Sequence, residues 1–192
     1  MAGRLFGLYA TRHDPFEAVV RLARPTMTRV GRDTGETVHL SVARNGHIVQ
    51  VAQTDSRYLL GSRDWSQIEV PSHCSSLGKV LYAYGALPLP HGHLERRTAH
   101  SPVDRAQLDH ALVEVRRRGW AASLDELELG LTAVGAPVRT VDGTVVAAVS
   151  VSGPTSRIND YGITQLGDLL VAELRGLSAL LGHQPARKEG SA

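Results

Sequence analysis

One hairpin signal limits the possible topologies of this chain more than any other pattern in it. The dipeptide Asn45-Gly46 separates two β-rich runs, 37–42 and 48–52. Asn-Gly favours a type I′ turn, in which both central residues need a positive φ and glycine adopts it without steric penalty. Because a two-residue connection joins only antiparallel strands, we expect an antiparallel sheet rather than a doubly wound parallel one.

A second turn signal, Asp142-Gly143, separates the runs 131–140 and 144–152 and continues the same pattern. Two further strands are expected, one at 120–123 and a short one around Ile68 and Val70. Helical patterns lie between these strands. This order predicts an α+β domain, with one twisted antiparallel sheet of about six strands and helices on its faces.

Four helices are expected, each with a recognisable start or end. The first opens at the cap Asp14-Pro15, is bent or restarted at Pro25, and ends before Gly35. The last begins near residue 159 and carries a leucine stripe as far as Gly182. Its intrinsic helicity is lowered by Gly162, Gly167 and Gly176, so packing must hold it. The remaining two helices start at the segments 72–75 and 101–104 and end at Gly85 and Gly119.

Composition and charge argue against several classes of protein. The chain has 192 residues, and 42% of them are hydrophobic, which is enough to bury the core of one domain. Its 21 basic and 19 acidic residues are well mixed, so no basic face for a nucleic acid backbone is indicated. No apolar run approaches the roughly 20 residues that cross a bilayer. We expect a cytoplasmic protein without membrane contact, and the single cysteine, Cys74, agrees with a reducing compartment.

Three segments, 34–42, 73–81 and 118–157, together resemble the effector-binding domain of the IclR family of transcriptional regulators. The third is the most specific, because the motif Ala136-Pro137-Val138 and the segment 149–157 match the family pattern in order and spacing. The similarity extends over about 14–181. The resemblance implies a GAF-like fold, a ligand-sensing role without catalysis, and assembly as a homodimer or a dimer of dimers.

The resemblance also implies a partner domain, because family members carry a winged helix-turn-helix domain that binds operator DNA. Only 13 residues precede Asp14, too few for such a domain. We therefore expect DNA contact only through a domain absent from this chain. The expected division is a linker-helix remnant or flexible N-terminus (1–13), an effector-binding domain (14–183) and a disordered tail (184–192).

Two polar groups stand out as candidates for ligand binding. The segment Ser75-Ser76-Leu77 opens a predicted helix, where backbone amides lack intrahelical partners and the helix dipole is positive. On the residues alone, a carboxylate seat and ordinary capping by Ser75 both stay open. Ser150 and Ser152 share one face of a predicted strand, and without the family they would be taken as solvent-facing polar residues.

The resemblance implies that an effector, a small organic acid, is held by four groups: the hydroxyls of Ser150 and Ser152 and the backbone amides of Ser76 and Leu77. Two further pocket positions match Ser123 and Ala133, where other members can carry an aspartate and a cysteine. Because this chain lacks both of those side chains, we expect a larger or more apolar acid than glyoxylate.

Two alternatives remain open. One is a thiol-dependent enzyme using Cys74 beside His73, since a thiol near a helix start can have a lowered pKa. The other is a GAF-like small-molecule sensor without a DNA-binding partner domain. We expect no metal or cofactor, because the spacing of four histidines does not match that of metal ligands: His91, His93, His100 and His110. Three acidic residues, Asp125, Glu126 and Glu128, are expected to cap a turn or to balance the charge of the arginines. We do not expect them to act in catalysis.

Overall fold

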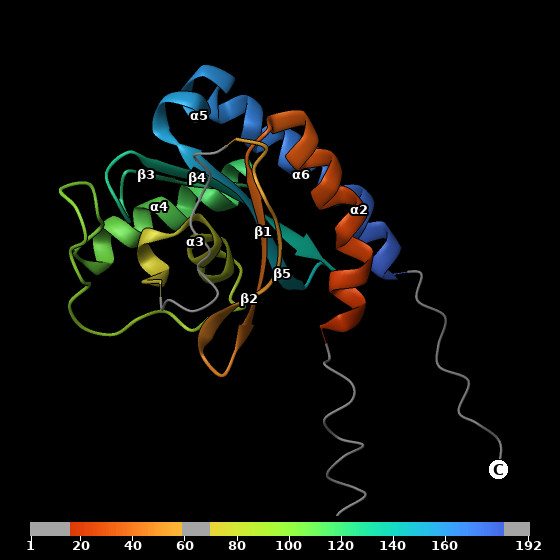
Figure 1. Cartoon of the computed structure of the whole chain (residues 1–192). Coiled ribbons are helices and arrows are strands. Elements are labelled where there is room, and N and C mark those ends of the chain that lie inside the picture. The colour runs from red at the N-terminus through yellow and green to blue at the C-terminus, as the bar shows by residue number, and fades with distance from the viewer. Residues whose placement is uncertain (1–15, 59–69, 183–192) are drawn as a thin grey trace, which may run out of the picture.

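The computed structural model describes residues 16–58 and 70–182, and the elements in them form an α+β domain (Figure 1). The helices are α2 (Glu17–Thr34), η1 (Ser72–Cys74, a 3-10 helix), α3 (Ser76–Ala83), α4 (Arg105–Arg118), α5 (Thr155–Tyr161) and α6 (Ile163–Gly182). The strands are β1 (Thr37–Arg44), β2 (His47–Thr54), β3 (Ala121–Leu124), β4 (Leu131–Arg139) and β5 (Val145–Pro154). No helix in this part of the chain is long and apolar enough to cross a membrane.

The five strands form one sheet in the order β2-β1-β5-β4-β3, and every neighbouring pair is antiparallel. The predicted fold class is therefore confirmed. Asn45 and Gly46 both have positive φ, 52° and 81°, as a type I′ turn requires. The strand expected around Ile68 falls outside the described residues, and Val70 is not in a strand.

The second turn differs from the expected two-residue hairpin. Register between β4 and β5 shifts at Arg139, and the amide of Thr140 donates to the carbonyl of Thr144 over 2.9 Å. The Asp142 carboxylate accepts from the Thr144 amide and from the Thr140 hydroxyl, and Gly143 has a φ of 86°. The side chain of Asp142 thus replaces some of the backbone bonds that a tighter hairpin would make.

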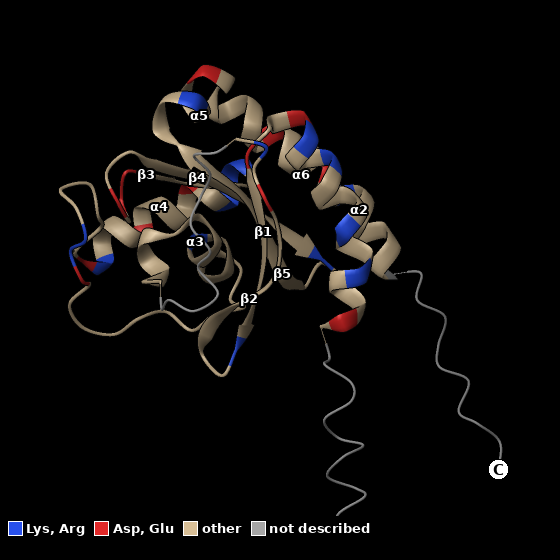
Figure 2. Ribbon diagram, in the orientation of Figure 1, with Lys and Arg blue, Asp and Glu red and all other residues tan. Residues whose placement is uncertain are grey.

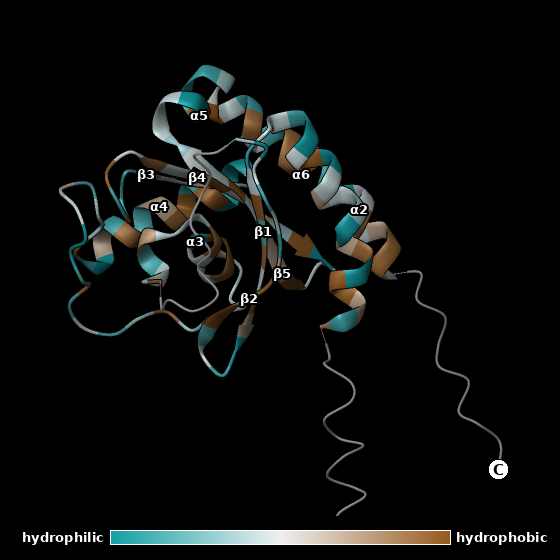
Figure 3. Cartoon of the chain, in the orientation of Figure 1, coloured by the Kyte–Doolittle hydropathy of each residue, from teal (hydrophilic) through white to brown (hydrophobic). Residues whose placement is uncertain are grey.

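Helices cover both faces of the sheet and bury a separate core on each. Figure 1 shows α2 and α6 side by side over one face, with α3 and α4 on the other. Figure 3 shows hydrophobic segments along the strands and on the helices packed against them. Along β5, Val149 and Val151 point into the core under α2 and α6, whereas Ala148 belongs to the core under α3 and α4. Ser150 and Ser152, which alternate with the two valines, therefore face the α3 side.

Three local expectations need correction. Helix α2 continues through Pro25 without a restart and ends at Gly35, whose φ is 75°. The expected start 101–104 is too early for α4, which is capped by Asp104 through a hydrogen bond from the amide of Gln107 and begins at Arg105. Gly162 divides the last helical stretch into α5 and α6. The cap expected at Asp14-Pro15 and the terminal segments 1–13 and 184–192 lie outside the described residues.

Lysine, arginine and acidic residues are interspersed over the helices in Figure 2. In the basic run 116–118, Arg117 is exposed and pairs with Glu114 on the same helix, whereas the other two arginines contact residues outside α4. Arg116 donates to the carbonyl of Ala83, and Arg118 donates to the carbonyl of Trp120 while its guanidinium lies 3.6 Å from the centre of that ring.

Two glycines of α6 make a matched pair for testing the packing on the sheet. A Cβ at Gly167 would overlap the Trp120 indole, whereas a Cβ at Gly176 meets nothing within 4 Å. We expect Gly167→Ala to lower the free energy of unfolding by about 1–3 kcal/mol through overpacking. Gly176→Ala is expected to raise it by up to about 1 kcal/mol through helix propensity. Urea unfolding followed by circular dichroism measures both changes, and equal gains in both variants would contradict the tight Trp120 contact.

Candidate functional site

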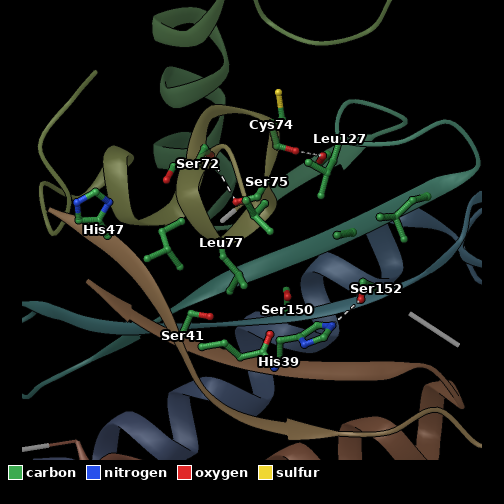
Figure 4. Close-up of a pocket in the computed structure, with 16 residues that line it drawn as sticks. His39, Ser41, His47, Ser72, Cys74, Ser75, Leu77, Leu127, Ser150 and Ser152 are labelled. Carbon is green, nitrogen blue, oxygen red and sulfur yellow. Dashed lines mark hydrogen bonds between the residues drawn. The ribbon is translucent and has the colours of Figure 1, made fainter. Parts of the chain in front are cut away.

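A cavity of about 120 Å³ lies between the α3-side face of the sheet and the segment that contains η1 and the start of α3 (Figure 4). Among the residues that the structure describes, its polar lining consists of His39, Ser41, His47, Gln50, Ser72, Ser75, Ser123, Ser150 and Ser152. The apolar lining consists of Ile48, Val70, Cys74, Leu77, Leu127, Leu131 and Ala133. Small-molecule sites typically combine apolar walls with convergent polar groups, and both kinds of residue line this cavity.

The start of α3 forms one wall of the cavity. The Ser75 hydroxyl accepts from the amide of Gly78 over 2.9 Å, so Ser75 caps α3. This bond uses the third amide of the helix. The amides of Ser76 and Leu77 have no hydrogen-bond acceptor in the described part of the chain. Capping and an open seat for an anion are therefore compatible.

Gly78 allows η1 to pack directly on α3, because any Cβ at this position would collide with the carbonyl of Ser72. The Leu77 side chain points toward the sheet and lines the cavity (Figure 4). Ser76 does not line it: its hydroxyl lies against Gly135, where a Cβ would come within 3.2 Å of that oxygen. Any role for Ser76 at the cavity is thus limited to its backbone.

Strand β5 forms the opposite wall. Ser150 and Ser152 are only 2% and 5% exposed, so they are buried polar residues facing a hollow and not a solvent-facing pair. The Ser152 hydroxyl lies 2.9 Å from Nε2 of His39, which is also buried. His39 sits opposite Ser150 in the register between β1 and β5.

Strands β3 and β4 contribute Ser123 and Ala133, which are register partners. The Ser123 hydroxyl donates to the carbonyl of Cys74 over 2.5 Å. This bond fixes η1 to the sheet, and it leaves the Ser123 oxygen only its acceptor capacity toward a ligand. The small Ala133 side chain leaves space in the cavity.

The thiol of Cys74 is poorly placed for nucleophilic chemistry. Its sulfur points away from the sheet face in Figure 4, although its carbonyl lies at the cavity wall. Burial raises the pKa of the Cys74 thiol, which is the opposite of what an activated thiolate needs. His73 is engaged elsewhere, because its Nε2 lies 2.8 Å from the carbonyl of Glu95.

No metal cluster is visible in residues 16–58 and 70–182, because no three His, Cys, Asp or Glu side chains are placed together to hold an ion. Arg157 binds the buried Glu36 carboxylate through two hydrogen bonds of 2.5 and 2.9 Å. Arg139 instead donates to the carbonyl of Gly143 and lies 4.0 Å from the centre of the Tyr84 ring. Neither guanidinium faces the cavity.

A buried ion pair supports the rim of the cavity. Lys79 on α3 donates to Glu126 over 2.5 Å and to the carbonyl of Ala122 over 3.0 Å. We had expected Glu126 to balance the arginines or to cap a turn, but its partner is Lys79. Desolvation raises the pKa of the Glu126 carboxyl despite the nearby cation. The next residue, Leu127, lines the cavity, so the pair ties α3 to the loop that follows β3.

Comparison with known proteins identifies the family of the chain. The family model described as the bacterial transcriptional regulator IclR C-terminal domain matches residues 16–179. The chain belongs to the IclR family. BhcR, an HTH-type transcriptional regulator of Paracoccus denitrificans strain Pd 1222, is 30% identical over 178 residues, which cover 90% of this chain and 63% of BhcR. The chain thus spans less than two thirds of the length of the curated relatives that it matches first.

Solved structures of IclR-family proteins share the fold. The IclR of Thermotoga maritima superposes with a TM-score of 0.76 at 23% identity, covering 92% of this chain and 72% of that one. The inducer-binding domain of PobR from Acinetobacter, a double mutant solved with 3-hydroxybenzoic acid, gives a TM-score of 0.70 at 25% identity. The match covers 83% of this chain and 97% of that domain.

The structure brings five of the six predicted site residues of this IclR-family domain to one cavity: Leu77, Ser123, Ala133, Ser150 and Ser152. Sequence analysis missed the contribution of β1. The polar residues His39 and Ser41 alternate with Leu40 and Val42, so the alternation that predicted the strand also predicted which of its faces is polar. What the pattern lacked was a reason to expect that face to be buried.

The ion pair gives a test of the rim in this IclR-family domain. Lys79→Met leaves the Glu126 carboxylate buried without its cation, and we expect a loss of about 3–5 kcal/mol in the free energy of unfolding at about pH 8. The folded-state pKa of Glu126 then lies further above its unfolded value, so the carboxyl takes up a proton more readily in the folded protein. The loss must therefore shrink as the pH falls toward about 5.

Urea unfolding of wild type and variant at both pH values measures this difference. The matched control is the double variant Lys79→Met with Glu126→Leu, which removes both charges and is expected to recover most of the loss. A loss that is independent of pH would show that the Lys79 stem, rather than its charge, stabilises the rim.

Proposed function

We propose that this IclR-family effector-binding domain senses a small organic acid held in the cavity between α3 and β5. The amides of Ser76 and Leu77 would receive the carboxylate, and the hydroxyls of Ser150 and Ser152 would bind it from the sheet. The observation that carries the proposal is that Leu77 at the start of α3 and Ser150 and Ser152 on β5, which are distant in sequence, line one cavity.

The chemistry of the walls favours an acid with an apolar body. A helix start contributes about 0.3–1 kcal/mol to binding an exposed anion and up to about 2 kcal/mol in a partly buried geometry, so it orients a ligand more than it supplies affinity. Leu77, Leu127 and Leu131 offer apolar surface around that seat. Engineered apolar cavities of about 150 Å³ bind benzene, and the cavity here has about 120 Å³.

Ser123 and Ala133, at positions where other members can carry an aspartate and a cysteine, also favour an acid with an apolar body. With the Ser123 hydroxyl committed to Cys74 and only a methyl group at Ala133, this end of the cavity is more apolar than one carrying an aspartate and a cysteine. The 3-hydroxybenzoic acid bound to the PobR domain is an acid of the expected kind. We therefore favour a monocyclic or branched acid over glyoxylate.

The role of the domain is regulatory in this proposal, not catalytic. The relatives are transcriptional regulators, and the Cys74 thiol is buried and turned away from the cavity. Ligand would stabilise one arrangement of the domain and so change operator binding by a helix-turn-helix domain of the whole regulator, working as a homodimer or a dimer of dimers in the cytoplasm. A coupling of about 1–3 kcal/mol changes affinity for the operator by about 5- to 150-fold.

A thermal-shift screen of small carboxylates and aromatic acids tests the site. We expect Ser150→Ala combined with Ser152→Ala to weaken binding of any acid that stabilises the wild type by at least about tenfold, because each hydrogen bond to a charged group contributes about 1.5–3 kcal/mol. Ser156→Ala, on the exposed side of α5, is the control and should leave the ligand-induced shift unchanged. Equal shifts in wild type and the double variant would remove these serines from the site.

A further inference from the structure

Strand β4 carries a glycine, Gly135, on the face that it turns toward α3. Its chain neighbours Val134 and Ala136 point into the core under α2 and α6, so Gly135 faces the other way. Glycine weakens the interior of a strand, and its presence there ordinarily marks a bulge, a positive φ or the close approach of another segment. The register with β5 is regular at Gly135, and its φ is not positive. The close approach of another segment remains as the explanation.

The segment that approaches Gly135 is the first residue of α3. A Cβ added to Gly135 would lie 3.2 Å from the Ser76 hydroxyl oxygen and 3.4 Å from the Ser76 carbonyl carbon. Favourable contacts between non-bonded carbon atoms lie at about 3.5–4.0 Å. Ser76 is only 1% exposed, so its side chain has little room to turn away. The start of α3 therefore reaches its position over the sheet only because β4 has no side chain there.

This contact lies directly beside the proposed carboxylate seat. Gly135 is the register partner of Ser150, and a Cβ on Gly135 would come within 3.4 Å of the Ser150 Cβ. Ser76 supplies the first amide of α3, and Leu77, which supplies the second, lines the cavity together with Ser150. The distance between these amides and the β5 hydroxyls is thus set where Ser76 meets Gly135.

The rest of the roof offers little slack to compensate for a shift at this point. The Ser123 hydroxyl holds η1 to β3 through the Cys74 carbonyl, and Gly78 packs η1 directly against α3. A displacement at Ser76 is therefore expected to move the first amides of α3 instead of being absorbed by η1.

A carboxylate is more sensitive to that distance than the apolar body of the same ligand. Hydrogen bonds to a carboxylate are short, about 2.7–2.9 Å for a charged N–H donor, and they weaken when distance or angle departs from the optimum. Contact of an apolar body with Leu127 and Leu131 is not directional. A change of the gap at Ser76 therefore affects acids more than neutral compounds of the same shape.

We propose that Gly135 is a positioning residue for carboxylate recognition. Because it carries no side chain, the start of α3 lies close enough to β5 for one carboxylate to bond to the amides of Ser76 and Leu77 and to the Ser150 hydroxyl together. The inference rests on the proposed function and adds the contact that sets its selectivity for acids. Gly135 acts through the position of Ser76 and not by touching the ligand.

Isothermal titration calorimetry with two acids and their neutral amides tests this: benzoate with benzamide, and 3-hydroxybenzoate with 3-hydroxybenzamide. We expect wild type to bind each acid at least about tenfold more tightly than its amide, because the amide lacks the charge and one acceptor oxygen. Gly135→Ala should lower this ratio by at least about threefold, through weaker binding of the acid. The affinity for the amides should change by less than about twofold.

Two further variants separate positioning from a general loss of stability. In Gly135→Ala combined with Ser76→Ala, the hydroxyl that the new methyl group would meet is gone and the backbone amide stays, so the ratio should return to within about twofold of wild type. Gly167→Ala is the matched control, because its added methyl group overlaps Trp120 under α6, on the other face of the sheet. This variant should lose stability and keep the ratio. If Gly135→Ala does not fold, Ser76→Val places the added bulk on the helix side of the same contact and should lower the ratio instead.

The outcomes distinguish the inference from the proposed function. An unchanged ratio in Gly135→Ala, or in Ser76→Val if that variant replaces it, would overturn the inference and leave the proposed function standing. A reduced ratio that the second substitution does not restore, or an equal reduction in Gly167→Ala, would do the same. Failure of both acids to bind wild type, or equal binding of each acid and its amide, would count against the proposed function and, with it, the inference.

Discussion

The central strand β5 has two buried faces of different character, and the rest of the domain follows from that division. Val149 and Val151 face the core under α2 and α6, and this face is wholly apolar. Ser150 and Ser152 face the other way, into a space that α3 covers without filling. Burial of hydroxyls is costly unless they are hydrogen-bonded, so a strand of this kind is stable only where partners or a guest satisfy them.

The cavity stays open because contacts with the sheet and with the loop after β3 hold η1 and α3 in place. The Ser123 hydroxyl ties η1 to β3 through the Cys74 carbonyl, and Gly78 lets η1 lie directly against α3. The Lys79–Glu126 pair joins α3 to the loop after β3. A ligand between β5 and α3 therefore touches elements that are already linked, so its binding energy can favour one arrangement of both, as a sensor requires.

Local chemistry predicted the elements well where neighbouring residues decide the outcome, and less well where a distant contact competes. The segment 101–104 was expected to start a helix. The structure uses Asp104, because the Ser101 hydroxyl bonds instead to the amides of Arg97 and Thr98 and to the carbonyl of Glu126. Pro25 likewise lies inside α2 although it has no amide hydrogen to donate, and the residues buried on either side of it, Ala23 and Met27, belong to the core under the helix.

The sequence by itself determined the antiparallel sheet, the glycine stops at Gly35 and Gly119, and the shared face of Ser150 and Ser152. Each depends on backbone geometry within a few residues, so the pattern is sufficient. Only the tertiary structure decided that His39 joins these serines, that Ser76 turns to Gly135, and that Lys79 is the partner of Glu126. Those outcomes depend on strand register and on how closely α3 approaches the sheet, and both are set by contacts between residues far apart in the chain.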